Sequence, residues 1–138
     1  MASKYVLDAC ALMALAKDED GAGVVEDILK VADNGDVEIY MNKLNLFEVF
    51  YGVRREEGLN KAEGVYKKVL ESPITIIDGI ADEVFLEASR IKSSYRMSLA
   101  DSIALGEASV MGASLITSDH HEFDAVEQSE NIKFTWIR

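Results

Sequence analysis

The chain has 138 residues, 49% of them hydrophobic, and a formal net charge of −11 at pH 7. This length can bury one sizeable core but is too short to divide comfortably into two, so we expect a single domain over residues 1–138. The acidity argues against a surface that grips nucleic acid broadly, because such binding needs many Lys and Arg side chains against phosphates. It suits a basic protein partner instead.

Five short runs rich in β-branched or aromatic residues alternate with longer stretches of helical spacing. The runs predict strands over residues 5–7, 37–41, 74–77, 114–117 and 132–136. The spacing predicts helices over residues 11–16, 24–31, 45–57, 60–70, 81–93 and 99–111. Strands that alternate with helices favour an α/β fold, a three-layer sandwich with a parallel sheet covered on both faces. Sites in such sheets form at the carboxyl ends of the strands.

Two aspartates directly follow predicted strands. Asp8 comes after the first strand and Asp119 after the run 115–118, so both side chains should lie at the carboxyl edge of the sheet. Each could instead cap a helix, because an aspartate at that position accepts a hydrogen bond from free backbone amides. Asp78 also follows a strand, and there Gly79 and an amphipathic helix favour simple capping. Position after a strand is therefore not sufficient to assign a ligand.

Two further acids lie in helical segments. Glu48 lies in the stretch 44–51, which is apolar on nearly every side. Burying an isolated carboxylate is unfavourable unless a metal, a pair or a shifted pKa compensates. The alternative is a glutamate at the edge of the core with its own basic partner. Asp101 has with Ser98 the spacing of a helix capping box, which can exist without any chemistry.

Taken together, the four acids Asp8, Glu48, Asp101 and Asp119 predict a metal site. Converging carboxylates repel one another, so such a cluster persists only if cations or protons neutralise it. All-oxygen ligands select Mg²⁺ or Mn²⁺ over softer metals. Metal-assisted cleavage of a phosphodiester is the chemistry that this set of residues fits.

The order and context of these acids resemble the PIN-domain family over essentially the whole chain. The segments that carry the resemblance are YVLDACAL (5–12), NLFEV (45–49), LADSIA (99–104) and LITSDHHEF (115–123). The resemblance implies a five-stranded parallel sheet flanked by helices. It also implies a Mg²⁺- or Mn²⁺-dependent ribonuclease of the kind that serves as the toxin of VapBC-type toxin–antitoxin pairs.

The resemblance assigns a role to each site residue. Asp8 and Asp101 match the main metal ligands of the family. Glu48 and Asp119 match the acids that complete the cluster, and Thr117 matches a hydroxyl that helps to position an acid or a bound water.

Two positions depart from the family pattern. Cys10 stands where many relatives carry Ser or Thr, and a thiol donates a weaker hydrogen bond than a hydroxyl. Glu107 stands where small residues are usual. We expect Glu107 on a solvated helix face rather than as an added ligand.

The histidines and the basic residues give weaker signals. Zinc binding by His120 and His121 is disfavoured, because adjacent histidines point in different directions and no third ligand supports them. We expect His120 in a loop before a buried Phe123. Lys92 and Arg96, one helical turn apart, are candidates for RNA contact, as are Arg54-Arg55; a solvated face is the alternative.

Competing functions and partners follow from the same residues. A haloacid-dehalogenase-like phosphatase needs a second aspartate where this chain has Cys10, and a response-regulator receiver needs paired acids near the first strand. A non-catalytic PIN scaffold and a stand-alone RNA-processing nuclease stay open as alternatives. We expect an RNA substrate, a homodimer, and a basic antitoxin whose arginine enters the acidic cleft.

We expect a cytoplasmic protein with no membrane partner. Cys10 is the only cysteine and cannot form an internal disulfide, which fits a reducing compartment. The segment Met1–Leu15 contains a lysine and an aspartate and reads poorly as a signal peptide, and no apolar run is long enough to cross a bilayer.

Overall fold

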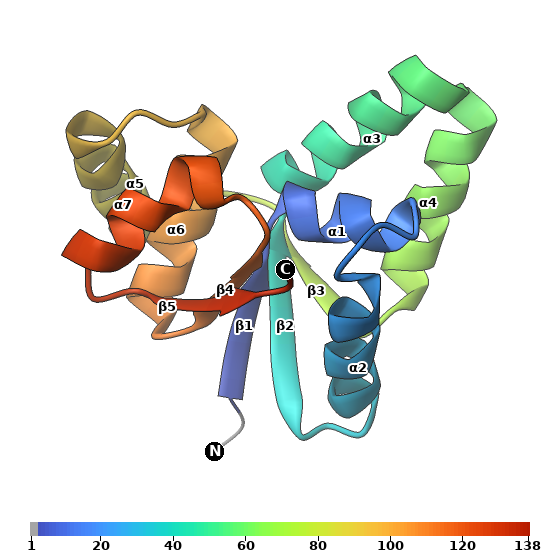
Figure 1. Cartoon of the computed structure of the whole chain (residues 1–138), viewed down its shortest axis with the longest axis horizontal. Coiled ribbons are helices and arrows are strands. Elements are labelled where there is room, and N and C mark those ends of the chain that lie inside the picture. The colour runs from blue at the N-terminus through green and yellow to red at the C-terminus, as the bar shows by residue number, and fades with distance from the viewer. Residues whose placement is uncertain (1–2) are drawn as a thin grey trace.

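The computed structural model describes residues 3–138, so the first two residues of the segment Met1–Leu15 lie outside it. The strands are β1 (Ser3–Leu7), β2 (Val37–Asn42), β3 (Ile74–Ile77), β4 (Ser114–Thr117) and β5 (Lys133–Trp136) (Figure 1). The helices are α1 (Ala9–Ala16), α2 (Ala22–Asp33), α3 (Lys43–Glu57), α4 (Leu59–Glu71), α5 (Asp82–Ser94), α6 (Leu99–Met111) and α7 (His120–Ser129). None of these helices is long and apolar enough to span a membrane.

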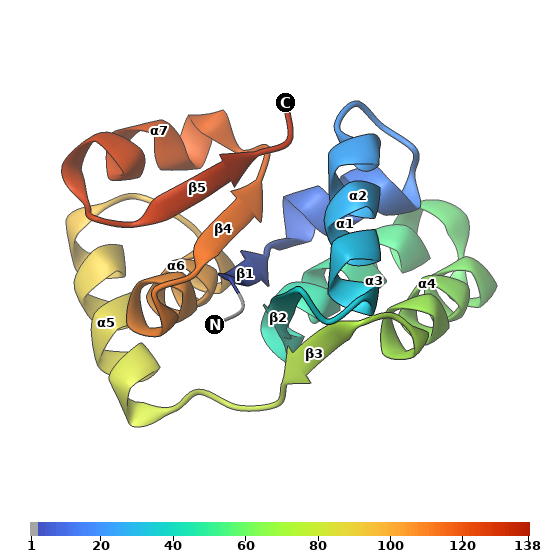
Figure 2. The ribbon, with the colours of Figure 1, turned by 90° about the horizontal axis from the view of Figure 1, so that it is seen from below.

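The five strands form one parallel sheet in the order β3-β2-β1-β4-β5 (Figure 2). The predicted five-stranded parallel sheet is thereby confirmed. The chain first extends the sheet from β1 to β2 and β3, and then returns to add β4 and β5 on the other side. The direction of winding therefore changes between β1 and β4. In open α/β sheets a crevice for ligands forms at such a point, beyond the carboxyl ends of the strands.

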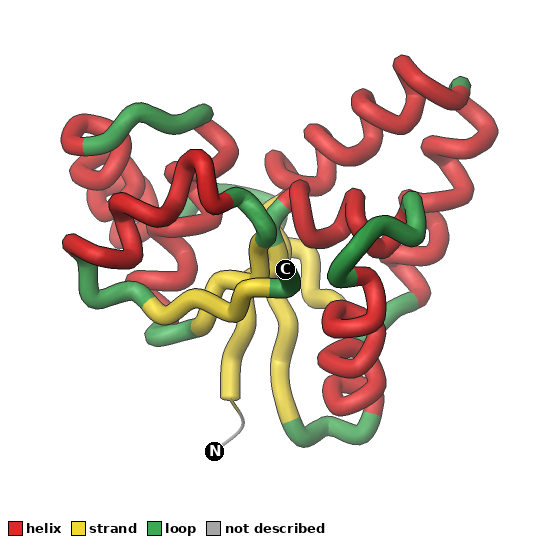
Figure 3. The backbone as a smooth tube through the Cα atoms, in the orientation of Figure 1, coloured by secondary structure: helices red, strands yellow, loops and turns green. Residues whose placement is uncertain are grey.

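Alternating side chains of the central strands divide the interior into two cores. Leu7 and Ile116 belong to the core formed with helices α1–α4, whereas the adjacent Val6 and Leu115 belong to the core formed with α5–α7. Successive side chains of a strand point to opposite faces, so both faces of these strands must be apolar. Figure 3 shows the helices on both sides of the strands, which confirms the three-layer sandwich.

Helix α7 is the element that the sequence patterns do not predict. Its first residue is His120, so the expectation that this histidine lies in a loop is wrong. The helix buries only Phe123 and Val126, which is too few apolar positions for a clear helical period. Its start is set by Asp119, whose Oδ1 accepts a hydrogen bond from the backbone N–H of Glu122 at 3.1 Å. The expected burial of Phe123 is confirmed.

Helices α5 and α6 pack closely at Gly106. A Cβ at this position would lie 3.0 Å from the Cβ and 3.1 Å from the backbone nitrogen of Ala88 on α5. A Cβ here would need α5 to move by a few tenths of an ångström, and backbone atoms cannot move aside as a flexible side chain can. This packing holds α6, the helix that carries Asp101.

Gly106→Ala should force α5 and α6 apart and lower the free energy of unfolding by about 1–3 kcal/mol, the usual range for overpacking a core. The matched control is Gly64→Ala in α4, where an added Cβ meets nothing within 4 Å. That change should raise the free energy of unfolding by about 0.5–1 kcal/mol, because alanine is the better helix former. Urea unfolding of the two variants measures both effects, and equal changes would contradict this account of the packing.

Candidate functional site

The four acids surround the carboxyl ends of β1 and β4. Asp8 directly follows β1, Asp119 lies just beyond β4, Glu48 lies in α3, and Asp101 lies in the first turn of α6. The charges of these acids interact. In addition to burial, the charges of Asp101 and Asp119 raise the pKa of Asp8, and the charges of Asp119 and Glu48 raise the pKa of Asp101. The structure thus brings all four residues into one acidic cluster.

Asp8 is the most deeply buried of the four acids, with 1% of its surface exposed. Its Oδ1 caps α1 by accepting a hydrogen bond from the N–H of Ala11 at 2.8 Å. Its Oδ2, hereafter the open oxygen, finds no hydrogen-bond partner among residues 3–138. Burial raises the pKa of Asp8 to about 7, although the nearby Thr117 hydroxyl and the Ala11 N–H lower it. Capping and ligand binding are therefore compatible, because they use different oxygens of one carboxyl group.

Thr117 and Asp119 contribute to the cluster from the end of β4. Thr117 is fully buried, and its Oγ1 accepts a hydrogen bond from the Asp119 N–H at 3.0 Å. The bond fixes the backbone at Asp119, whose Oδ1 caps α7. The other oxygen, Oδ2, lies 4.0 Å from the Sγ of Cys10, the thiol donating.

Asp101 and Glu48 are half-buried and approach from the helices. The Oγ of Ser98 caps α6 by accepting a hydrogen bond from the Asp101 N–H at 3.1 Å, as the capping-box spacing predicts. Burial raises the pKa of Asp101 to about 6 and also raises the pKa of Glu48. Both side chains are partly exposed, as is Asp119, so solvent can reach these three acids, whereas Asp8 is buried.

Glu122 is a neighbour of the cluster that sequence reasoning did not assign. Its charge contributes to the raised pKa of Asp101, and its N–H is the group that Asp119 caps. A sequence pattern that predicted α7 would also have indicated Glu122, because a residue three positions after an N-cap faces back toward the cap.

The cluster is loose rather than a preformed metal cage. In the part of the chain that the structure describes, no three His, Cys, Asp or Glu side chains already converge closely enough to hold an ion. Mg²⁺ keeps several of its waters and binds through one or two carboxylates, so it needs no such cage. The open oxygen of Asp8 and the all-carboxylate donor set fit a hard cation of this kind.

Cys10 is held as a thiol at the edge of the cluster. Burial and the charges of the four acids raise its pKa to about 12. A protonated thiol is a weak donor, so its contact with Asp119 constrains that carboxylate less than a hydroxyl would.

Glu107 does not lie on a solvated face, and the expectation that it would is wrong. Only 1% of its surface is exposed, and its Oε2 accepts a hydrogen bond from Asn42 Nδ2 at 3.3 Å. Burial raises the pKa of Glu107 to about 7. The physical reason is that α6 is buried on all sides from Ser102 to Ala108, so it offers no polar face there.

The capping role expected for Asp78 is also wrong. The N-cap of α5 is Ala81, and Asp78 instead lies 3.7 Å from Lys43 in an exposed ion pair. The turn between β3 and α5 is longer than a cap directly after the strand would allow.

The basic candidates lie at the surface. Lys92 and Arg96 are both exposed, and Lys92 Nζ donates a hydrogen bond to the carbonyl of Met97 at 2.9 Å. Lys92 thereby shapes the segment that leads to Asp101. His120 stacks on Trp136 with ring centroids 3.8 Å apart, and its nitrogens pair with Asp124 and the carbonyl of Arg138.

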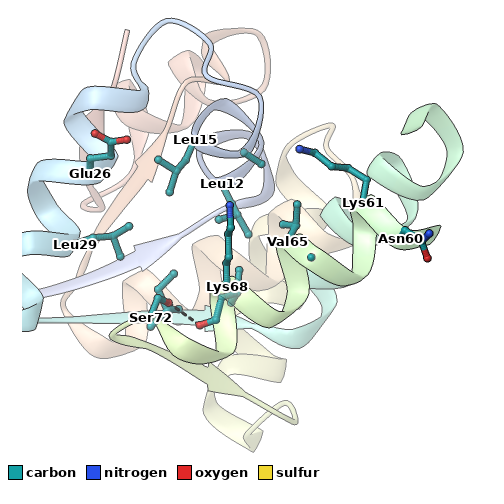
Figure 4. A pocket seen from close by; sticks show the side chains of 13 residues that line it. Leu12, Leu15, Glu26, Leu29, Asn60, Lys61, Val65, Lys68 and Ser72 are labelled. Carbon is teal, nitrogen blue, oxygen red and sulfur yellow. Dashed lines mark hydrogen bonds between the residues drawn. The ribbon is translucent and has the colours of Figure 1, made fainter. Parts of the chain in front are cut away.

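A separate groove of about 440 Å³ lies between α1, α2 and α4 (Figure 4). Leu12 and Leu15 of α1, Leu29 of α2 and Val65 of α4 line it. Lys61 and Lys68 from α4 and Glu26 from α2 add charged groups. Its lining is mainly apolar, in contrast to the acidic cluster.

These features define a class: small α/β proteins in which acids gather at the carboxyl ends of a parallel sheet. The chain belongs to the PIN domain family, whose family model matches residues 5–128. The resemblance to that family is thereby confirmed. No curated protein sequence matches the chain.

Solved structures of toxin–antitoxin proteins have the same fold. DNA-bound VapBC from Salmonella typhimurium matches with a TM-score of 0.75 and 14% identity, over 99% of each chain. A toxin–antitoxin complex from Klebsiella pneumoniae matches with a TM-score of 0.70 and 16% identity, over 97% of this chain and 98% of that one. VapC20 from Mycobacterium tuberculosis, a sarcin–ricin-loop-cleaving toxin, matches with a TM-score of 0.67 and 12% identity, over 88% and 94%.

Asp8→Asn should change how stability depends on pH in metal-free protein. Because the pKa of Asp8 is raised in the folded state, the folded protein binds a proton at Asp8 more tightly than the unfolded chain does. This proton contributes its full stabilisation below the unfolded pKa of about 3.8, and the stabilisation is lost as pH rises through about 7. Asparagine mimics the protonated acid. The free energy of unfolding of the variant should therefore equal that of wild type near pH 4. At pH 8 it should exceed that of wild type by on the order of a few kcal/mol.

The measurement is urea unfolding in chelator across this pH range, with Asp36→Asn at an exposed position as the control. A difference between Asp8→Asn and wild type that is constant with pH would contradict the assignment of a raised pKa to Asp8.

Proposed function

We propose that this protein is a divalent-metal-dependent ribonuclease of the VapC-like toxin kind. The observation that carries the proposal is the buried carboxyl group of Asp8, whose open oxygen has no hydrogen-bond partner in the described chain and whose pKa is raised by burial and by the charges of Asp101 and Asp119. Membership in the PIN domain family supports a nuclease, and the fold shared with VapC20 supports the toxin class.

In this proposal the side chains divide the work of the site. Asp8 and Asp101 would be the main ligands of the ion, and Glu48 and Asp119 would complete the ligand set. Thr117 keeps Asp119 in place through the backbone hydrogen bond. Bound Mg²⁺ or Mn²⁺ would polarise the phosphodiester and supply hydroxide from a coordinated water.

The proposed substrate is RNA with an exposed backbone, in a single strand or loop. A chain with a net charge of −11 repels nucleic acid over most of its surface, so contact should be confined to the site and a few basic groups. Lys92 and Arg96 are the proposed groups, since both are exposed on the segment that leads to Asp101. Such narrow contact suits an unpaired segment better than a duplex.

Asp101→Asn should abolish RNA cleavage without unfolding the protein. Removing a residue that only supports a metal ligand lowers metal affinity or activity about 10–100-fold. Removing a ligand should therefore lower the rate of RNA cleavage about 100-fold or more. The measurement is cleavage of a mixed pool of single-stranded RNA with Mn²⁺, with Mg²⁺ and with chelator. The control is Glu63→Gln, an exposed acid in α4. Cleavage that persists in chelator, or no cleavage by metal-loaded wild type, would favour a non-catalytic scaffold.

The proposed partner is a basic antitoxin. Structural neighbours from Klebsiella pneumoniae and Salmonella typhimurium are toxin–antitoxin complexes, which supports a partner of this kind. An arginine of the antitoxin would enter the acidic cluster, where a guanidinium can pair with two carboxylate oxygens. The apolar groove between α1, α2 and α4 would receive an apolar segment of the same partner.

Gly64→Phe should weaken this complex while leaving metal binding intact. Gly64 lines the groove, and the position of its missing Cβ meets nothing within 4 Å, so a phenyl group would fill the space proposed for the partner.

Glu48→Lys should also weaken the complex, because the new lysine would repel the arginine of the antitoxin. Co-purification with a co-expressed basic antitoxin measures both effects, with Gly64→Ala as the control. Equal recovery of all variants would count against this mode of binding.

A homodimer, a single domain and a cytoplasmic location complete the proposal. Large apolar side chains stay exposed on α3 and α5, among them Phe47 at 59%, Phe85 at 63% and Leu86 at 68%. An exposed apolar surface of this kind supports association between copies of the chain. The match of the family model to residues 5–128 supports one domain.

A further inference from the structure

Glu107 is a buried acid that the proposed chemistry does not use. It lies on α6, the helix that carries Asp101, but its pKa responds only to burial and to Asn42, and to none of the acids of the cluster. Its neighbours on the helix, Leu105 and Ala108, are buried apolar residues. Glu107 is therefore electrostatically separate from the cluster, although it shares a helix with one of its members.

The hydrogen bonds of Asn42 connect Glu107 to the helix that carries Glu48. Asn42 is the N-cap of α3, and its Oδ1 accepts a hydrogen bond from the Leu44 N–H at 2.8 Å. This bond fixes the orientation of the amide, because only the oxygen can accept it. Nδ2 then donates to the carbonyl of Gly79 at 3.0 Å and to Glu107 Oε2 at 3.3 Å. One buried amide thus joins α3, the segment after β3, and α6.

We propose that Glu107 is a positioning residue that sets the spacing between Asp101 and Glu48 by anchoring α6 to the start of α3 through Asn42. The inference rests on the proposed metal-dependent function. Asp101 is on the same helix as Glu107, and Glu48 is on the helix that Asn42 caps. A change in the bridge would shift the two half-buried acids relative to each other, and a metal ion that contacts both would bind more weakly.

Stability alone gives no reason for an acid at this position. Replacing a buried ionisable group by an apolar residue of similar volume is often neutral or stabilising, because the desolvation penalty disappears. The buried polar groups here are also incompletely paired: within residues 3–138, Glu107 Oε1 and both amide atoms of Asn45, one turn along α3, find no partner. Buried polar groups retained at such a penalty are best attested where they fix the register of packed elements.

The test compares Mn²⁺ affinity, measured by titration calorimetry, among folded variants. Glu107→Leu should weaken Mn²⁺ binding about tenfold, the lower range for residues that support metal ligands. Glu107→Gln keeps an oxygen that can accept from Asn42 Nδ2, so it should stay within about threefold of wild type, by the same scale. Asn42→Ser still caps α3 but is too short to reach Glu107, and it should weaken binding like Glu107→Leu. It also serves if Glu107→Leu does not fold.

A double-mutant cycle separates positioning from a general loss of structure. If Glu107 acts by setting the spacing between Asp101 and Glu48, then Glu107→Leu should weaken Mn²⁺ binding less in a Glu48→Gln background than in the wild-type background. Wild-type affinity in folded Glu107→Leu, or an equal loss in both backgrounds, would overturn the inference and leave the proposed function intact. Failure of the wild-type protein to bind Mn²⁺ would overturn the proposed function and this inference with it.

Discussion

The carboxyl group of Asp8 is buried at the end of the central strand, and the rest of the site depends on how its charge is neutralised. One oxygen is held by the start of α1, while the open oxygen has no partner in the described chain. A buried carboxylate near Asp101 and Asp119 must take up a proton or a cation near neutral pH. The raised pKa values of Asp8 and Asp101 express this constraint. The fold maintains it because β1 and β4 adjoin at the point where the winding of the sheet changes direction.

Helix capping is the means by which the fold places these acids. Asp8 caps α1, Asp119 caps α7, and Asp101 lies in a first turn that Ser98 caps. Backbone N–H groups at helix starts stabilise negative charge, so each cap lowers the penalty of bringing acids together without removing it. Capping and the proposed metal binding thus use the same residues, and the structural explanation of each acid does not exclude the functional one.

The sequence predicts the sheet because buried parallel strands are short apolar runs between helices. It predicts Asp8 and Asp119 at the carboxyl edge because both follow such runs, whereas Glu48 and Asp101 are indicated by their apolar and helix-start contexts. It fails where periodicity is weak or misleading. Helix α7 buries two residues and lacks a clear period, whereas α6 is buried all round and has no solvated face for Glu107. The burial of Glu107 was nevertheless predictable, because Glu107 is an isolated acid in an apolar run. The same pattern indicates a buried acid at Glu48. The bridging role of Asn42 has no such signal, because it depends on contacts between residues far apart in the chain.

The most direct test of the central claim is the anomalous difference map of a crystal soaked in Mn²⁺ near pH 8. The account predicts a peak about 2.1 Å from the open oxygen of Asp8, with a carboxylate oxygen of Asp101 or its bridging water in the coordination shell. Little or no peak should appear at pH 5, where protons neutralise Asp8 instead. A map at pH 8 with no peak at the acidic cluster, or with the ion bound elsewhere on the chain, would contradict the claim.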